Sequence, residues 1–158
     1  MADECLACDL AAGRRPLPGG RIFQTEFWLV EHCVGPLGLG TLIVKPERHV
    51  TTVAGLSAAE AAELGPLLRQ ASWVAGQLTG ADQVYNCLWS HLGGQPGHIH
   101  YVVQPVTRVQ TAAYEAFGLG LQVAMSLVGD FPDEAEVARL AERARELFAL
   151  GPPPDGLS

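Results

Sequence analysis

The chain has 158 residues, of which 48% are hydrophobic and 17% charged, a balance typical of one ordered globular domain rather than a disordered segment. Ten Lys and Arg against 17 Asp and Glu give a net charge of −7, which disfavours a broad binding surface for DNA or RNA. No apolar run reaches the roughly 18 residues needed to cross a bilayer, and the acidic N-terminus does not resemble a secretion signal. We therefore expect a cytoplasmic protein that binds neither nucleic acid nor membrane.

The first motif along the chain is the Cys-x-x-Cys pair of Cys5 and Cys8. In a reducing compartment such a pair more often binds a metal or performs redox chemistry than forms a structural disulfide. Redox pairs open a helix within a βαβ unit, whereas no strand precedes this pair, so the pattern favours a metal. A structural zinc site needs two further ligands. The candidates are the histidines, which are His32, His49, His91, His98 and His100.

Four segments have the composition of β-strands, with β-branched and aromatic residues between turns that contain Gly or Pro. They cover residues 27–31, 39–46, 84–91 and 98–106. Together they favour a mostly antiparallel sheet. Because alternate side chains of a strand share a face, the last segment places His98, His100, Val102 and Gln104 on one side.

The helical signals begin between the second and third strands. Ser57 and Glu60 form a capping box, and the apolar spacing after it predicts a helix over about 58–78. Pro66 should kink that helix or move its start later, because proline lacks an N–H. Two more helices are expected, over residues 114–128 and 130–150, the second capped by Asp130.

Three stretches, CLACDL, GTLIVKPERHV and GGQPGHIHYVVQPV, have the order and spacing of landmarks in the histidine triad (HIT) superfamily of nucleotide hydrolases and transferases. The chain resembles this superfamily over about residues 5–106. The resemblance implies that His100 is the nucleophile, because it matches the second histidine of the family motif. It also implies one structural zinc ion per chain and a homodimer. The implied zinc ligands are Cys5, Cys8, His49 and His98.

The chemistry of imidazole supports the same role for His100. Its unperturbed pKa of about 6.5 leaves much of the ring unprotonated at neutral pH, so the ring can attack without a separate base. Attack on the α-phosphorus of a nucleotide would form a nucleotidyl-histidine intermediate, which water or an acceptor phosphate then opens.

The sequence departs from the family motif at two positions. Val102 stands where the third histidine is expected, and Pro96 stands where many members have a hydroxyl residue after Gly-Gln. Phosphate binding should then depend on the neighbouring loop and strand, with Lys45 or Arg48 as further candidates. The expected phosphate-binding residues are His91, Gly94, Gln95 and Gln104.

These observations predict an α+β protein with a mostly antiparallel sheet, a long helix packed on it and a helical C-terminal extension. We expect a HIT-like catalytic domain with an N-terminal zinc knuckle over residues 1–110, a helical extension over 111–150 packed on the same domain, and a flexible tail over 151–158.

The leading functional hypothesis is a hydrolase or nucleotidyl transferase that acts at the α-phosphate of a small nucleotide or nucleotide conjugate through His100. One alternative is a catalytically weak or inactive zinc-stabilised nucleotide-binding module, which the changes at Val102 and Pro96 favour. A second alternative is a transferase of the dinucleoside polyphosphate phosphorylase type, in which phosphate opens the intermediate.

Overall fold

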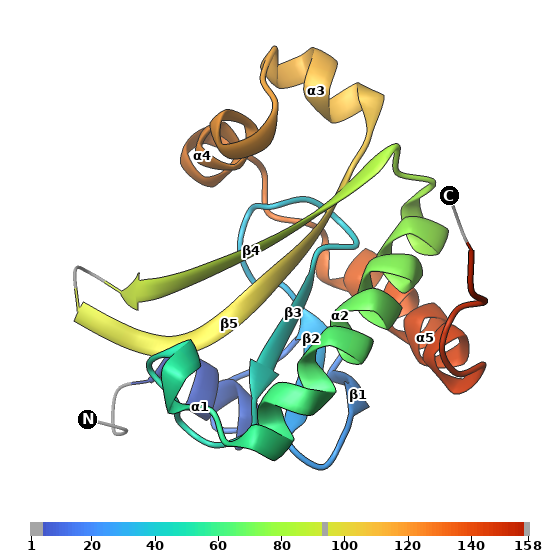
Figure 1. The fold of residues 1–158 in the computed structure, drawn as a ribbon. Coiled ribbons are helices and arrows are strands. Elements are labelled where there is room, and N and C mark those ends of the chain that lie inside the picture. Colours follow the sequence, from blue (N-terminus) through green and yellow to red (C-terminus); the bar gives the residue numbers. More distant parts are fainter. Residues whose placement is uncertain (1–4, 93–94, 157–158) are drawn as a thin grey trace.

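A single five-stranded antiparallel sheet, with strand order β1-β2-β3-β5-β4, organises the protein (Figure 1). The structure is a computed structural model, which describes residues 5–92 and 95–156. The strands are β1 (Arg21–Gln24), β2 (Trp28–His32), β3 (Leu42–Pro46), β4 (Gln83–Leu92) and β5 (Gln95–Val106). The helices are α1 (Leu6–Ala11), α2 (Ala58–Thr79), α3 (Arg108–Tyr114), α4 (Gly118–Val128) and α5 (Glu134–Ala149), with a 3₁₀ turn η2 (Val53–Gly55). The predicted α+β class is confirmed.

One face of the sheet carries the main hydrophobic core, under α2 and α5 (Figure 1). The core side chains of β2, β3 and β5 on this face include Trp28, Val44 and Val103, all of which are fully buried. The indole N–H of Trp28 donates to the carbonyl of Glu60 at 2.9 Å and so fixes the first turn of α2 on the sheet. The other face of β5, which includes His98 and His100, is thereby left for the site.

The long helix α2 begins where the capping box predicts. The Ser57 hydroxyl accepts a hydrogen bond from the Glu60 N–H, and the Glu60 carboxylate accepts one from the Ser57 N–H. Pro66 lies inside the helix and does not delay its start. The missing N–H of Pro66 removes one backbone hydrogen bond, but eight capped residues precede it and the buried side of the helix holds it in place.

The C-terminal helices differ from the sequence-based expectation in two places. The helix expected over 114–128 begins only at Gly118, as α4, and an unpredicted helix, α3, ends at Tyr114; the chain turns between them at Glu115, with a left-handed φ of 48°. The N-cap of α5 is Asp133, whose carboxylate accepts from the Glu136 N–H at 3.0 Å, and not Asp130. Pro132 explains why the helix starts later than expected. Helical φ/ψ angles are unfavourable for the residue before a proline, so Phe131 could not be the first helical residue.

The predicted division of the chain into residues 1–110, 111–150 and 151–158 stays a prediction. Helix α5 packs on β1, β2 and α2. The segment that follows α5 contacts α2. The guanidinium of Arg69 on α2 donates to the Pro154 carbonyl at 2.8 Å and lies 3.2 Å from the Asp155 carboxylate. The described end of the chain therefore lies against α2.

Arg48, one of the two further candidates for phosphate binding, is engaged in an ion pair with α2. Its guanidinium forms two hydrogen bonds, of 2.6 and 2.7 Å, with the Glu60 carboxylate, and it also donates to the Gly55 carbonyl. The hydrogen bonds from Arg48, with those from Ser57, lower the pKa of Glu60 to about 2. We infer that Arg48 anchors the start of α2.

This depressed pKa predicts a pH dependence of stability. A carboxylate with a lowered folded-state pKa stabilises the fold above its unfolded value of about 4.3, and that contribution is lost as the pH falls toward 2. We expect the urea midpoint of the wild type to fall between pH 5 and pH 2 by more than that of Glu60→Gln. Glu142→Gln, at an exposed position on α5, controls for the charge change. If the urea midpoint fell equally with pH in the wild type and in Glu60→Gln, the pH dependence could not be assigned to Glu60.

Candidate active site and metal centre

Two cysteines and two histidines meet where α1 lies against the end of the sheet. Cys5 is the N-cap residue of α1, Cys8 lies in the helix, His49 follows β3 and His98 is on β5. Their four ligand atoms all lie within 4.8 Å of one another. The Cys8 Sγ is 3.3 Å from Nδ1 of His49 and 3.4 Å from Nδ1 of His98. Two thiols and two imidazoles in one cluster form the donor set of a tetrahedral metal site.

Backbone contacts hold both histidines in the cluster. The Ile99 N–H donates to the Val50 carbonyl at 2.8 Å, so the segment after β3 runs beside β5 and carries His49 next to His98. Nε2 of His98 lies 2.9 Å from the Pro46 carbonyl, an obligate acceptor, which places the ring proton on that nitrogen. The lone pair of Nδ1 then faces Cys8. This arrangement orients a ligating imidazole through its second nitrogen.

Burial sets the protonation states that a metal would meet. Burial lowers the pKa of His98 to about 4, so its ring is neutral and its lone pair is available at neutral pH. Burial, together with the hydrogen bond between the Cys8 thiol and Cys5, which favours the protonated thiol, raises the pKa of Cys8 to about 11. A bound metal would have to displace that proton, because the thiolate is the ligand form.

A buried ion pair fixes α1 over this end of the sheet. The ammonium of Lys45 on β3 lies 2.5 Å from the Glu31 carboxylate on β2 and donates to the Ala7 carbonyl in α1 at 2.9 Å. Both charged side chains are almost fully buried. A six-residue helix has little stability of its own, so this contact positions Cys8. Lys45 is therefore not free to bind a phosphate, contrary to the sequence-based suggestion.

His100 lies two residues beyond His98 on the same face of β5 and is partly exposed. Its Nδ1 is 3.1 Å from the His98 carbonyl. Because the carbonyl can only accept, Nδ1 carries the proton and Nε2 keeps its lone pair. The ring is thus held in the Nδ1–H tautomer, which leaves Nε2 able to act as a nucleophile. The carbonyl that holds it belongs to His98, a residue of the metal cluster.

Trp89 is the aromatic neighbour of His100, and the sequence did not distinguish it from the other two tryptophans. It pairs directly with His100 in the β4–β5 register and remains 46% exposed. Trp28 is fully buried and Trp73 packs against the core, as expected for structural tryptophans. Cross-strand pairing is the signal that could have identified Trp89. If the last two strands form an antiparallel pair, counting along both strands from the turn between them places Trp89 near His100.

The structure describes the side chains of two of the four predicted phosphate-binding residues, Gln95 and Gln104. Gln104 is fully buried beneath α4, where its amide donates toward the Leu37 carbonyl and the Met125 sulfur and its oxygen accepts from Gln122. Gln104 shares the strand face of His100, but the helix covers that end of it. Gln95 is exposed at the start of β5. The side chain of His91, and Gly94, lie outside the described residues.

Val102 is a buried apolar residue at the position where the sequence motif predicts a third histidine. It lies 2% exposed between its register partners Ile43 on β3 and Cys87 on β4. The described residues therefore place no acidic or basic side chain on β5 beyond His100 on this face.

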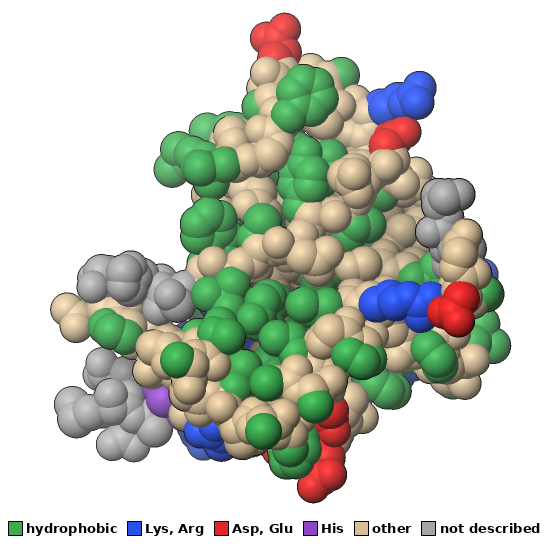
Figure 2. All heavy atoms as spheres, in the orientation of Figure 1, with side chains coloured by type: hydrophobic (Ala, Val, Ile, Leu, Met, Phe, Trp, Pro, Cys, Tyr) green, Lys and Arg blue, Asp and Glu red, His purple; other side chains and the backbone are tan. Residues whose placement is uncertain are grey.

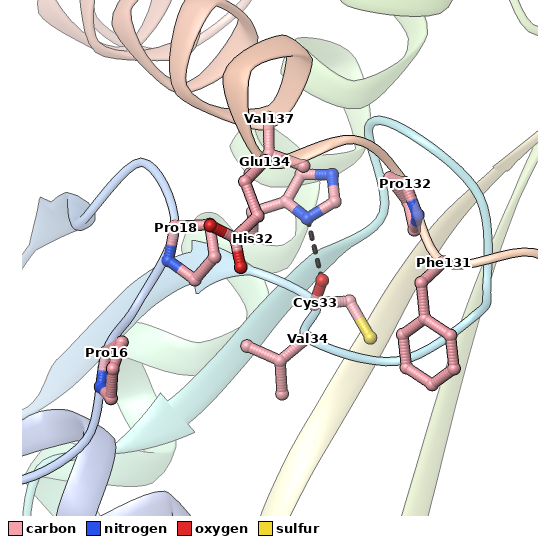
Figure 3. Close-up of a pocket in the computed structure, with 9 residues that line it drawn as sticks. All are labelled: Pro16, Pro18, His32, Cys33, Val34, Phe131, Pro132, Glu134 and Val137. Carbon is pink, nitrogen blue, oxygen red and sulfur yellow. Dashed lines mark hydrogen bonds between the residues drawn. The ribbon is translucent and has the colours of Figure 1, made fainter.

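A cavity of about 230 Å³ lies at the opposite end of β2 from Pro46 and the metal cluster (Figure 3). It is lined by Pro16, Pro18, His32, Cys33, Val34, Phe131, Pro132, Glu134 and Val137. The His32 ring donates from Nδ1 to the Cys33 carbonyl at 2.7 Å and accepts at Nε2 from the Gly40 N–H at 2.9 Å. Both ring nitrogens are occupied, so His32 is a structural residue and not a metal ligand.

The fold and site define a small α+β protein that carries a Cys₂His₂ cluster beside a second strand histidine. Solved structures show the same architecture. A zinc-bound histidine triad family protein from Mycobacterium smegmatis is 19% identical, with a TM-score of 0.67 over 95% of this chain and 96% of that one. A hypothetical histidine triad nucleotide-binding protein from Sulfolobus tokodaii is 17% identical, with a TM-score of 0.69 over 92% and 93% of the two chains.

A HIT family member from Bacillus subtilis is also similar, at 13% identity and a TM-score of 0.59, over 97% of this chain and all of that one. A scan against protein-family models and a search of curated proteins found no match. The protein has the HIT fold, as the sequence motifs predict. Among the described residues, no helix is both long enough and apolar enough to span a membrane.

Proposed function

We propose that the protein cleaves or transfers the nucleotidyl group of a small nucleotide conjugate through a covalent intermediate on His100. The observation that carries this proposal is the His100 ring itself. Its Nδ1 proton is engaged by the His98 carbonyl, which leaves the lone pair on Nε2, and the ring lies on a partly exposed face. The HIT fold, and the nucleotide-binding description of the Sulfolobus neighbour, support a nucleotide as the ligand.

In this mechanism Nε2 of His100 attacks the α-phosphorus, and the bond from phosphorus to the leaving group breaks as the P–N bond forms. The ring becomes cationic, and the His98 carbonyl stabilises the Nδ1–H that carries part of this charge. Water, or an acceptor phosphate, then attacks phosphorus, and the P–N bond breaks to release the nucleotide product and restore Nε2.

The Cys₂His₂ cluster fits a structural zinc ion, one per chain, held by Cys5, Cys8, His49 and His98. Four protein ligands leave no open position, so the ion would stiffen the backbone around His98 rather than activate water. That backbone includes the carbonyl that orients His100. The metal cluster and the nucleophile are in this way connected through a single residue.

The apolar residue Val102 bears on which leaving groups the site could accept. Val102 cannot protonate a leaving group as a histidine at this position could, so leaving groups that depart as stable anions should be preferred over amines, which must be protonated as they leave. We therefore favour nucleotide conjugates that contain a phosphoanhydride, such as dinucleoside polyphosphates, over nucleoside phosphoramidates. The zinc-stabilised nucleotide-binding module remains the second candidate, and the buried Val102 favours it.

A product assay distinguishes these functions. The purified protein is incubated with a dinucleoside polyphosphate, a nucleotide sugar and a nucleoside phosphoramidate, each with and without inorganic phosphate. The proposal expects a nucleoside monophosphate as the product in water. The phosphorylase alternative expects a nucleoside diphosphate that forms only with added phosphate. Binding of nucleotide without any product would support the binding module and overturn the enzymatic proposal.

Trp89 gives the proposal a second test. Its exposed ring beside His100 offers a surface on which a flat, apolar part of the substrate can stack. Trp89→Ala is expected to raise KM by about 5- to 30-fold with a smaller change in kcat, since stacking of this kind is worth about 1–2 kcal/mol. Trp89→Phe, which keeps an aromatic face, should retain most of the affinity. An unchanged KM in Trp89→Ala would show that the substrate does not contact this ring.

A further inference from the structure

The ion pair between Lys45 and Glu31 is the most deeply buried one between described residues. The two side chains are 1% and 4% exposed, and the ammonium lies 2.5 Å from the carboxylate. In every other ion pair between described residues the basic side chain is at least 45% exposed. Figure 2 shows pairs of that exposed kind, blue beside red, at the right of the face that it draws. The buried pair is therefore an exception that needs a specific explanation.

The strand register places this pair on the face of the sheet that carries His100. Across β2 and β3, Glu31 is the diagonal neighbour of Lys45 on one face. Ile43 shares that face because it lies two residues before Lys45, and it pairs with Val102 on β5. Val102 is in turn two residues from His100. The main core lies on the other face of the sheet, so the ion pair is not part of that core.

The stability of the fold does not by itself account for a buried ion pair at this place. Moving an ammonium and a carboxylate out of water is costly, and their mutual attraction offsets this cost only when the geometry is excellent. Replacement of such a pair by apolar residues of similar volume is often neutral or stabilising. An apolar pair could fill the same space, but it could not donate a hydrogen bond to α1.

That hydrogen bond fixes the end of α1 that carries the two cysteines. Nζ of Lys45 donates to the Ala7 carbonyl at 2.9 Å, and Ala7 directly precedes Cys8. Helix α1 has six residues, and its N-cap residue Cys5 makes no side-chain capping hydrogen bond. So short a helix has little stability of its own. The position of Cys8 over the sheet therefore depends on contacts such as that with Lys45.

The next residue of β3 holds the other half of the metal cluster. The Pro46 carbonyl accepts a hydrogen bond from Nε2 of His98 at 2.9 Å, and His49 follows three residues after Pro46. Two consecutive residues of β3 thus orient ligands from distant parts of the chain. Lys45 orients a cysteine through the Ala7 carbonyl, and Pro46 orients a histidine directly.

We propose that Lys45 and Glu31 are positioning residues of the metal centre. The ammonium holds the peptide before Cys8 in place ahead of metal binding, and the Glu31 carboxylate holds the ammonium. This proposal rests on the zinc centre proposed above. Without the contact, metal binding would also have to order this end of α1, which costs conformational entropy. Contacts that orient metal ligands in this way are worth about 10- to 100-fold in metal affinity.

The test is a zinc titration of the metal-free full chain in competition with a chromophoric chelator. The double variant of Glu31→Leu with Lys45→Met is expected to raise the zinc Kd by about 10- to 100-fold. Its urea midpoint in the metal-free state should equal or exceed that of the wild type, because the apolar pair no longer buries charge. A role in stability alone predicts the reverse, a lower midpoint with an unchanged Kd.

Arg21→Gln is the matched control. Arg21 donates to the Ala11 carbonyl at 3.1 Å, so it also contacts α1, but at the end away from Cys8. This variant should bind zinc nearly as tightly as the wild type. Circular dichroism confirms that each variant is folded. Should the apolar double variant not fold, Glu31→Gln with Lys45→Gln replaces it, since glutamine is uncharged and one bond shorter than lysine, and the same rise in Kd is expected.

A folded double variant that binds zinc as tightly as the wild type would overturn this proposal and leave the zinc centre intact. An equal rise in Kd for Arg21→Gln would also overturn it, because the effect would then belong to the docking of α1 in general. A wild type that binds no zinc would refute the zinc centre, and this proposal with it. One set of titrations therefore separates the two failures, and neither depends on whether His100 is catalytic.

Discussion

Replacing His100 with Asn is expected to lower the rate of the chemical step by a factor of about 10³ or more, equivalent to ~4 kcal/mol. The Asn amide can still donate to the His98 carbonyl, but it has no nucleophilic nitrogen to take the place of Nε2. Nucleotide affinity should stay within a few-fold, because the substitution removes bond formation rather than substrate contacts. Single-turnover kinetics with a phosphoanhydride substrate, together with equilibrium binding of a nucleoside monophosphate, separate the two effects.

Cys87→Ala is the matched control for this experiment. Cys87 lies on the neighbouring strand β4, opposite Val102, and contributes to the same sheet face. This variant should retain turnover. If His100→Asn also retained turnover while remaining folded, the covalent mechanism would be refuted and the product assay would have to be explained by another nucleophile.

Replacing Cys8 with Ser is expected to lower zinc content from about one ion per chain to a small fraction of that value. The Cys8 Sγ lies 3.3 and 3.4 Å from Nδ1 of the two histidines of the cluster, so the substitution removes a ligand in contact with both of them. Structural zinc contributes about 10–16 kcal/mol of apparent binding free energy in small zinc domains. We therefore also expect a large drop in the thermal midpoint of Cys8→Ser, measured at matched protein concentration.

Cys33→Ser is the control here, because Cys33 lies by the separate cavity rather than in the cluster. It should keep its metal. A chelator should destabilise the wild type and Cys33→Ser but change Cys8→Ser little. Metal content that is unchanged in Cys8→Ser would show that Cys5, Cys8, His49 and His98 are not the ligand set.

The parts of the fold that sequence predicts best are those with a local physical signal. The capping box of Ser57 and Glu60 is local, and α2 begins where it predicts. The alternation of β5 is local too, and it places His98 and His100 on one face. The four residues of the metal cluster, in contrast, could be predicted together only from the resemblance to a family. No local pattern connects Cys8 with a histidine 90 residues away.

The parts that sequence missed depend on packing between distant segments. Nothing local distinguishes Lys45 and Glu31 from ordinary polar residues on the solvent-facing side of a strand, and their burial depends on the docking of α1. Gln104 has the strand face of a site residue, but α4, which folds back from later in the chain, covers it. The division between α3 and α4 depends on the left-handed turn at Glu115, which is a rare conformation for a residue other than glycine.

The most direct test of the central claim is to trap the intermediate. The wild type is mixed with a phosphoanhydride substrate, quenched in base to preserve a P–N bond, digested and analysed by mass spectrometry. The account predicts a nucleotidyl group on the peptide that contains His100, formed at a rate that matches turnover and absent from His100→Asn. Turnover without an adduct, or an adduct on another residue, would contradict it.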